Sequence, residues 1–264
     1  MSETGVGGAG GVQGLILRAM GAVDYRLTVT SPARYLTDRY VRLGFSGGGL
    51  LRDRPYHPTM FLRLWFEDRN GRPHQRGYTV IDPDPITDSF AVEFALHEGV
   101  ACRWALAAQP GDVLGATFLR SGFAVPDPAP AGWLLVGEPA SLPAINSLLD
   151  ALGTQGPPAT IWFEWVHDSD KDLPIRLRPH DTLHWVRRGR HRHARGGAGR
   201  PGSRAPGIVG ALRDAAFDAS GHFGWVALDT ARTLAIAAIL RADYKLSRNE
   251  VKAQAYWLET RGPS

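Results

Sequence analysis

Two neighbouring stretches decide the fold, Arg76-Gly77-Tyr78-Thr79 and the alternating run Phe90-Ala91-Val92-Glu93-Phe94-Ala95-Leu96-His97. Both have the period of two that is typical of β-strands. In the second run the larger apolar residues share one face, which is predicted to point into a barrel core, and the other face carries Ala91, Glu93, Ala95 and His97. The pattern therefore predicts two strands whose outer faces carry polar and small residues.

The residue types on these strands suit a flavin. The arginine of the first stretch, Arg76, can bind a diphosphate, and a tyrosine ring such as Tyr78 can lie against a flat heterocycle. Two alanines on the outer face of the second strand would let a cofactor approach the backbone. The alternative interpretation, favoured by spacing alone, is an ordinary half-exposed strand.

The composition is that of a water-soluble globular protein. The chain has 264 residues, 44% of them hydrophobic and 21% charged, which is enough for one large domain or two ordinary ones. No apolar run is long enough to span a membrane, and residues 1–13 are expected to form a flexible arm, without the pattern of a secretory signal. The single cysteine, Cys102, excludes an intramolecular disulfide and a thiolate cluster, so the cytoplasm is the expected location.

The positive charge is concentrated in one segment. The net charge is +4, and residues 187–206 are rich in arginine and contain no acidic residue. We interpret this segment as a solvated basic loop, because its glycines and prolines oppose a packed element. The alternative is a patch for phosphates, nucleic acid or an anionic membrane surface.

The pattern changes at a proline-rich linker, residues 124–132. Before it, short strand-like runs and turns predict an antiparallel β-barrel domain over 14–123, with a short helix at 101–108. After it, strands alternate with helices and predict an α/β domain with a mainly parallel sheet over 133–264. The expected strands are 133–136, 161–166, 183–186 and 224–227, the expected helices are 142–152, 208–217 and 230–244, and a final segment lies at 251–257.

The first strand-to-helix turn of the second half is a candidate nucleotide site. Gly137 and Glu138 lie where nucleotides bind in open parallel sheets, close to a helix N-terminus. An ordinary turn is as plausible, because the glycine-rich dinucleotide fingerprint is absent. The histidines show no metal-ligand spacing, and no nucleophile motif is present.

These residues resemble the siderophore-interacting protein family, which comprises FAD-dependent ferric-siderophore reductases with a ferredoxin-reductase-like fold. The resemblance extends from about Gly14 to Gly262, and its motifs occur in the family's order. The chain is also similar to the siderophore-interaction domain that is fused to mycobacterial carboxymycobactin importers. The matching segments are Arg76–Thr79, His97, Gly99–Ala105, Gly137–Ile145 and Tyr256-Trp257.

The resemblance implies FAD between two domains and assigns residues to it. Arg76 would hold the diphosphate, Tyr78 would stack on the isoalloxazine and Thr79 would hydrogen-bond it. The remaining implied cofactor contacts are Gly77, Glu93, Phe94, Ala95, Leu96, His97, Ala101, Cys102, Arg103, Trp104, Tyr256 and Trp257. The implied NAD(P)H contacts are Gly137, Glu138, Ser141, Leu142, Arg187 and Arg188.

Some positions depart from the family pattern. Cys102 stands where many members have serine, Glu138 replaces the usual aspartate, and Leu258 follows Tyr256-Trp257 in place of a basic residue. The family's Trp-x-Ala-Gly-Glu segment is here Trp225–Asp229. These changes leave the electron donor open between NADPH, NADH and a ferredoxin.

The resemblance implies a flavin-dependent oxidoreductase that reduces Fe(III) in a ferric siderophore and so releases iron. Its expected donor is NAD(P)H, and no protein residue is expected to act as a catalytic acid or base, or as a metal ligand. The expected partner is a ferric siderophore, with a mycobactin-like chelate as one candidate. The chain is expected to be a monomer that binds no nucleic acid, located in the cytoplasm or at the inner face of the plasma membrane. The alternatives are a siderophore carrier without catalysis and another flavin reductase on the same scaffold.

Overall fold

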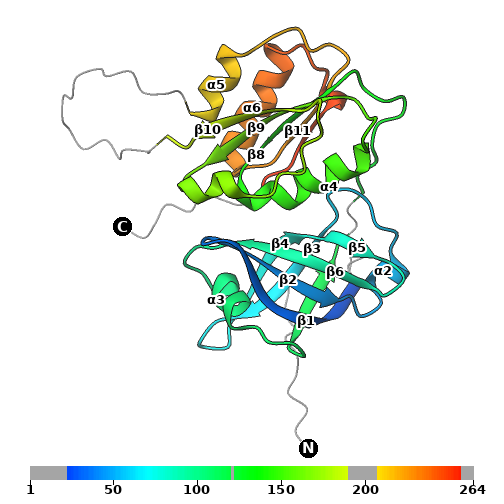
Figure 1. Ribbon diagram of the computed structural model, residues 1–264, viewed down its shortest axis with the longest axis vertical. Coiled ribbons are helices and arrows are strands. Elements are labelled where there is room, and N and C mark those ends of the chain that lie inside the picture. Colours follow the sequence, from blue (N-terminus) through cyan, green and yellow to red (C-terminus); the bar gives the residue numbers. More distant parts are fainter. Residues whose placement is uncertain (1–22, 120–121, 190–206, 257–264) are drawn as a thin grey trace, which may run out of the picture. The chain divides into compact units, whose positions relative to one another are not determined.

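The computed structural model describes residues 23–119, 122–189 and 207–256 (Figure 1). Residue contacts divide the chain into two compact units. The first takes in the described residues of Met1–Val125 together with Pro143–Ala151 and Leu173–Ile175, and the second takes in those of Pro126–Leu142, Leu152–Asp172 and Arg176–Ser264.

Unit 1 is built on one antiparallel sheet of seven strands, in the order β4-β3-β7-β1-β2-β6-β5. The sheet curls into a half-barrel whose edge regions approach each other, because the ring of Tyr78 on β4 lies 4.5 Å from that of Phe94 on β6. Its elements are β1 (Val23–Thr37), β2 (Tyr40–Ser46), α2 (Leu50–Asp53), β3 (Phe61–Glu67), β4 (Pro73–Thr79), β5 (Ile81–Asp84), β6 (Ser89–Ala95), α3 (Val100–Ala107) and β7 (Val113–Phe118).

The core of unit 1 lies inside this curved sheet. Alternate residues of each strand point inward, as the period of two requires. On β6 the inward residues Phe90, Val92 and Phe94 are all buried, as the sequence predicts. They pack with Leu27, Val41, Leu43, Phe45, Leu62, Leu64 and Phe66.

Unit 2 contains a parallel sheet of five strands, in the order β10-β9-β8-β11-β12. The first strand of this sheet along the chain, β8, lies in the middle. The next two, β9 and β10, lie on one side of it, and β11 and β12 lie on the other side. The order therefore reverses between β8 and β11. Its elements are β8 (Trp133–Gly137), β9 (Ala159–Trp165), β10 (Thr182–Arg187), α5 (Ile208–Asp214), β11 (Phe223–Val226), α6 (Thr230–Ala242), β12 (Val251–Ala253) and the 3-10 turns η1 (Pro139–Ser141), η2 (Asp168–Asp172) and η3 (Arg248–Glu250). Between β8 and β9 the chain forms α4 (Leu142–Leu152), whose residues Pro143–Ala151 belong to unit 1.

Helices α5 and α6 cover one face of this sheet (Figure 1). Val136 and Val226 from the strands pack there against Leu212 of α5 and Ile236 of α6, and all four side chains are fully buried. Tyr244, which follows α6, is also buried, and its hydroxyl donates a hydrogen bond of 2.7 Å to the carbonyl of Leu212. Apolar packing and this bond fix both helices on the sheet.

The two predicted sheet types, antiparallel in the first half and parallel in the second, are confirmed. The helix predicted at 208–217 is shorter and ends at Asp214, and the final segment forms a strand only over Val251–Ala253. The short helix α2 and the strand β5 were not predicted, because each is too short to show a periodic pattern. The predicted arm 1–13 and most of the basic loop 187–206 lie outside the described residues.

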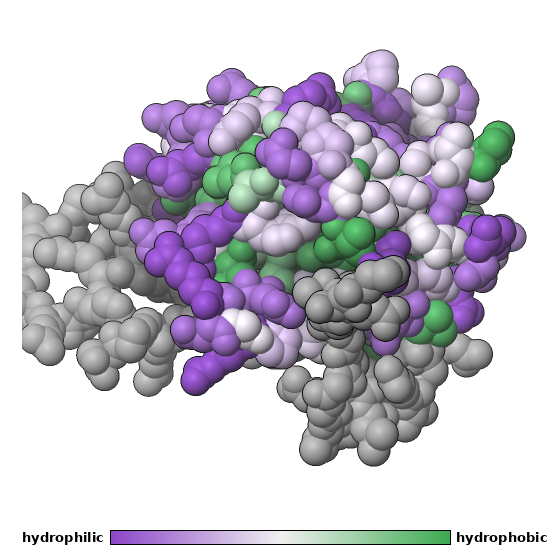
Figure 2. Space-filling model, turned by 90° about the horizontal axis from the view of Figure 1, so that it is seen from below, coloured by the Kyte–Doolittle hydropathy of each residue, from purple (hydrophilic) through white to green (hydrophobic). Residues whose placement is uncertain are grey.

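Hydrophilic residues dominate the face of unit 1 seen in Figure 2, and the hydrophobic ones gather in a recess near the centre of the view. Within the described ranges, no helix has the length and apolar character needed to cross a membrane.

The turn after β2 gives a test of the sheet geometry. Gly48 has a positive φ of 61°, and a Cβ atom there would lie 2.3 Å from the backbone oxygen of Arg26. We expect Gly48→Ala to lower the free energy of unfolding by about 3 kcal/mol, because it combines left-handed strain with a backbone clash.

The matched control is Gly71→Ala. Gly71 also has a positive φ, 72°, but a Cβ atom there meets nothing within 4 Å. Its cost should be about 1 kcal/mol, from backbone strain alone. Urea denaturation of both variants measures the difference, and equal costs would contradict the clash.

Candidate functional site

Several of the predicted cofactor contacts lie at the N-terminus of α3 in unit 1. The N-cap residue of this helix, Gly99, has no side chain that could cap its first amides. An uncapped helix N-terminus attracts a phosphate group through these amides and the helix dipole. Arg103, in the first turn, and Arg76, on β4, are exposed cations in the same unit.

His97 lies beside this helix. Its imidazole lies so close to Gly99 that a Cβ atom on that glycine would be 2.9 Å from the ring. Hydrogen bonding with Cys102 raises the pKa of His97 from 6.5 to about 9, although burial lowers it. The pKa of its partner Cys102 is lowered in turn, so a protonated imidazole would be matched by a thiolate beside it.

Cys102 is the partner of this histidine. Burial raises the pKa of the Cys102 thiol, but hydrogen bonds with His97 outweigh burial, and the net pKa is lowered. The sulfur also lies 3.5 Å from the carbonyl oxygen of Ala95. The buried cysteine and the histidine thus tie the end of β6 to the first turn of α3.

Tyr78 is half-buried beside this region. Its ring packs against Phe94 at 4.5 Å and against Phe66 at 6.0 Å. Burial raises the pKa of the Tyr78 phenol above its ordinary value, so the ring stays neutral. One part of this aromatic surface is held by the core, and the rest remains accessible.

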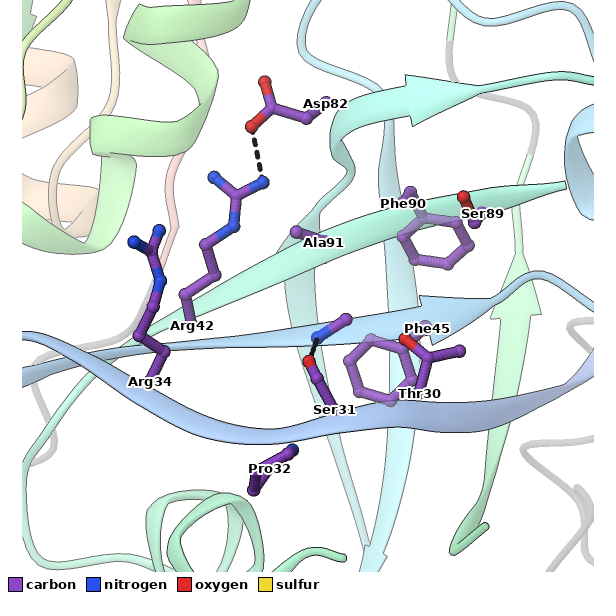
Figure 3. Close-up of a pocket in the computed structure, with 11 residues that line it drawn as sticks. Thr30, Ser31, Pro32, Arg34, Arg42, Phe45, Asp82, Ser89, Phe90 and Ala91 are labelled. Atoms are coloured by element: carbon purple, nitrogen blue, oxygen red, sulfur yellow. Dashed lines mark hydrogen bonds and ion pairs between the residues drawn. The ribbon is translucent and has the colours of Figure 1, made fainter. Parts of the chain in front are cut away.

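An open pocket of about 500 Å³ lies on the outward face of β1, β2, β5 and β6 (Figure 3). Ala91 and Gly44 keep the backbone of β6 and β2 accessible in it, and the rings of Phe45 and Phe90 lie at one side. The pocket extends the small-residue face that the sequence predicts on β6. Its volume is within the range of ligand sites in proteins.

The side chains of Arg34 and Arg42 lie side by side at one end of this pocket (Figure 3). Arg42 donates to Asp82 at 2.5 Å and to the buried carboxylate of Glu93 at 3.4 Å. Asp82 has a positive φ of 47°, a strained conformation for a non-glycine residue. Arg34, exposed, follows the irregular pairing of β1 at Ser31, where the strand leaves regular register with β2.

Several predicted cofactor contacts turn toward the core instead. The side chain of Phe94 is fully buried, and Trp104 stacks on Phe45 at 6.4 Å. Thr79, Ala101 and Cys102 are also buried. Among the predicted residues of unit 1, the exposed ones are Arg76, Gly77, His97 and Arg103, and the half-buried ones are Tyr78, Ala95, Leu96 and Trp104.

A cluster of charged residues lies at the carboxyl edge of the parallel sheet in unit 2. Strands β8, β9, β10 and β11 each deliver one member at or just after their ends, and α6 adds another. Three carboxylates are almost fully buried, with exposed fractions of 3% for Glu138, 2% for Glu164 and 0% for Asp229. Buried carboxylates need cationic partners.

Two arginines supply these partners. Arg188 forms ion pairs with Glu138 and, at 2.6 Å, with Glu164. Arg232 forms ion pairs with Glu164 and Asp229 and lies 3.5 Å from Glu138. Hydrogen bonds and charge from Arg232 hold the pKa of Asp229 below its ordinary value, although burial acts in the opposite direction. We call Glu138, Glu164, Arg188, Asp229 and Arg232 the edge network.

The other predicted residues of unit 2 surround this network. Gly137, Ser141 and Leu142 are buried after β8. Arg187 is exposed, and its guanidinium lies 5.2 Å from the ring of Trp165, over which the Lys171 ammonium lies at 3.8 Å. Tyr256 packs against Trp225 at 6.3 Å, and Trp257 lies outside the described residues.

Sequence reasoning missed three members of the edge network, Glu164, Asp229 and Arg232. One signal was available, because Asp229 directly precedes a helical segment and Arg232 follows three residues later, a typical N-cap arrangement. The described parts of the chain contain no group of three or more His, Cys, Asp or Glu residues that could hold a metal ion.

The sequence matches two family patterns in order. The pattern described as "Siderophore-interacting FAD-binding domain" matches residues 27–117, and the one described as "Siderophore-interacting protein" matches residues 130–260. The mycobactin import ATP-binding/permease protein IrtA of Mycolicibacterium smegmatis is 34% identical over 96% of this chain. The match spans only 28% of the length of IrtA.

Other relatives share the fold at lower identity. The ferric vibriobactin reductase ViuB of Vibrio cholerae is 26% identical over 74% of this chain and 67% of its own. The structure of a siderophore-interacting protein from Acinetobacter baumannii superimposes with a TM-score of 0.72 at 21% identity, covering 90% of this chain and 92% of that one. Together with the two sheets, these matches confirm the predicted ferredoxin-reductase-like fold.

The edge network gives a stability prediction. We expect Arg232→Met to lower the free energy of unfolding by about 3 kcal/mol, because three buried carboxylates would keep only Arg188 as a partner within the network. Arg241→Met, an exposed position on the same helix, should change it by less than about 0.5 kcal/mol. Thermal and urea unfolding measure both, and equal effects would show that the network contributes nothing.

The histidine–cysteine pair gives a pH prediction. The pKa of His97 is raised, so its contribution to stability is complete below pH 6.5 and is lost as the pH rises through about 9. In NMR titrations, His97 should have its midpoint near 9, and Cys102→Ser should move the midpoint toward 6.5. An unchanged midpoint in the variant would refute the pairing.

Proposed function

The chain belongs to the siderophore-interacting protein family, and from this premise we propose that it is an FAD-dependent ferric-siderophore reductase. The N-terminus of α3 carries the proposal, because its N-cap is a glycine without a capping side chain and the exposed cations Arg76 and Arg103 lie in the same unit. FAD brings a diphosphate that needs such a site. The substrate is Fe(III) held by a siderophore, and reduction weakens the hold of hard oxygen ligands on the metal.

The residues of unit 1 fit the cofactor. The α3 amides and Arg103 would bind the diphosphate with Arg76, and the accessible part of Tyr78 would lie against the isoalloxazine. Ala91 and Ala95 leave room on the outer face of β6, and the pocket in Figure 3 continues that room. Bound FAD would supply the redox chemistry, taking electrons from a donor and passing them singly to iron.

The protein's own residues position and tune this chemistry. The pairing of His97 with Cys102 would position the first turn of α3 for the diphosphate, and Arg42 holds the buried Glu93 carboxylate on the face that the cofactor would cover. The donor is NAD(P)H or another reductant. Its predicted contacts Gly137, Glu138, Ser141, Leu142, Arg187 and Arg188 lie at or near the carboxyl edge of the parallel sheet.

The relatives suggest the substrate class. ViuB is named a ferric vibriobactin reductase, and IrtA a mycobactin importer. A mycobactin-type chelate is therefore the first substrate to test, at the cytoplasmic side of the membrane. The rival function is a siderophore carrier without catalysis, which would bind the chelate without reducing it.

FAD binding tests the proposal directly. We expect Arg76→Ala combined with Tyr78→Ala to weaken FAD binding at least about 100-fold, because charged hydrogen bonds and ring contact are both lost. Arg72→Ala removes an exposed arginine from the turn before β4 and should leave binding unchanged. Flavin fluorescence titration measures all three proteins, and tight binding by the double variant would refute the site.

Activity separates the enzyme from the carrier. The purified protein with FAD should be bleached anaerobically by a reductant and reoxidised by a ferric mycobactin-type or hydroxamate chelate. Ferrous iron is then trapped by a coloured chelator. Binding of the chelate without iron reduction would favour the carrier.

A further inference from the structure

A β-bulge places two arginines directly opposite each other on the outward face of unit 1. In the pairing of β1 with β2, Ser31 lies opposite Gly44 and Arg34 lies opposite Arg42, so β1 uses one residue more than β2 between these pairs. Bulges next to functional sites often redirect a side chain. Directly opposite residues of antiparallel strands point to the same side of a sheet, and Figure 3 shows the two guanidinium groups extending in the same direction.

Two like charges directly opposite each other destabilise a sheet, and an anion between them offsets the cost. Arg42 has such anions within the protein, because it donates to Asp82 at 2.5 Å and to Glu93 at 3.4 Å. Arg34 is exposed, and among the described residues its guanidinium has no hydrogen-bond or ion-pair partner. Arg34 is therefore the cation of this pair that is available to an external anion.

The accessible lining of the pocket beside Arg34 is polar. The hydroxyls of Thr30, Ser31 and Ser89 line it, and all three residues are exposed or half-buried. The rings of Phe45 and Phe90 lie at its side but are buried, with exposed fractions of 0% and 4%. Little ring surface is thus open to a ligand, whereas the hydroxyls can donate hydrogen bonds to it. This lining suits an oxygen-rich, hydrophilic anion better than a hydrocarbon chain.

The pocket lies on the same side of β6 as the face that we assign to the cofactor. Ala91 lines the pocket, and Ala95, which belongs to the implied FAD contacts, is on the same face of the strand. Four residues of a strand span about 13 Å. None of the FAD contacts implied for unit 1 lines the pocket, so a second ligand could bind there beside the cofactor.

We propose that this pocket is the substrate subsite of the proposed reductase, and that Arg34 binds a carboxylate that the ferric chelate carries outside its iron-binding groups. The inference rests on the proposed function. A guanidinium fork binds a carboxylate through two parallel charged hydrogen bonds. Arg34 is then a specificity-determining residue, and the chain prefers an acidic, hydrophilic chelate to a neutral one with the same iron centre.

Two derivatives of ferrioxamine B test this preference at a constant iron centre. Acylating its free amine with succinate adds a carboxylate, and acetylating the amine gives a neutral chelate with the same hydroxamate groups. The gallium(III) forms of both resist reduction, so calorimetry with the full chain measures binding without electron transfer. Wild type should bind the succinyl form about tenfold more tightly, as one hydrogen-bonded contact between opposite charges predicts.

Variants of the arginine separate its charge from its role in folding. Arg34→Gln should bind both derivatives equally, and Arg34→Lys, which keeps the charge without the fork, should retain part of the preference. Arg34→Gln should unfold at no lower temperature than wild type, because it removes one of two like charges. Arg26→Gln is the matched control, since it removes an exposed arginine of β1 outside the pocket, and it should keep the full preference.

Three binding results would overturn the subsite. The first is equal binding of the two derivatives by wild type, and the second is a full preference in Arg34→Gln. The third is free succinate or inorganic phosphate binding as tightly as the succinyl chelate, which would make the pocket a simple anion site.

Reduction of the iron(III) forms supplies a second readout. With FAD bound and dithionite as the reductant, Arg34→Gln should raise the KM for the succinyl chelate about tenfold while kcat and FAD affinity stay at wild-type values. If no chelate is reduced but the gallium preference is found, the proposed function fails and the binding subsite stands. If both chelates are reduced equally well by wild type and variant, the function stands and the subsite fails. Weaker FAD binding by Arg34→Gln would assign the pocket to the cofactor and overturn the proposal.

Discussion

The N-termini of helices are the physical constraint around which both units are organised. Every helix begins with amides that lack intrahelical partners and with a partial positive charge. This chain meets the constraint in two ways. At α6 it supplies its own carboxylate, Asp229, which accepts from the amide of Arg232, and at α3 the N-cap is Gly99, which has no capping side chain. An uncapped end is suited to an external anion, whereas a capped end is already satisfied.

The self-capped end imposes a second requirement, because buried carboxylates are costly without cations. The register of the parallel strands brings cations to these carboxylates. β10 pairs with β9 so that Arg188 donates its amide to Trp165 and reaches Glu164 and Glu138 with its side chain. Arg232 closes the network from the first turn of α6. The ends of four strands are thereby joined through charge, at the edge that open α/β sheets ordinarily use for ligands.

Much of the fold could be predicted from the sequence, because period and turn chemistry are local. The inward face of β6 follows directly from its alternation, and Phe90, Val92 and Phe94 are buried as expected. The partners of its outward face could not be predicted in the same way. Glu93 is covered by Arg42, which comes from a strand 51 residues away through antiparallel register. Long-range pairing of this kind leaves no local pattern.

The same limit explains the two arginines at the end of β10. Both look available for a phosphate in the sequence, yet they differ in the structure. Arg187 is exposed against Trp165, and Arg188 pairs with carboxylates that follow or lie within other strands. Consecutive residues of a strand point to opposite sides, so the guanidinium of Arg188 reaches the network and that of Arg187 does not. Glu138 and Asp229, from the ends of two different strands, both approach Arg232, so this one arginine depends on strand order as well as on local sequence.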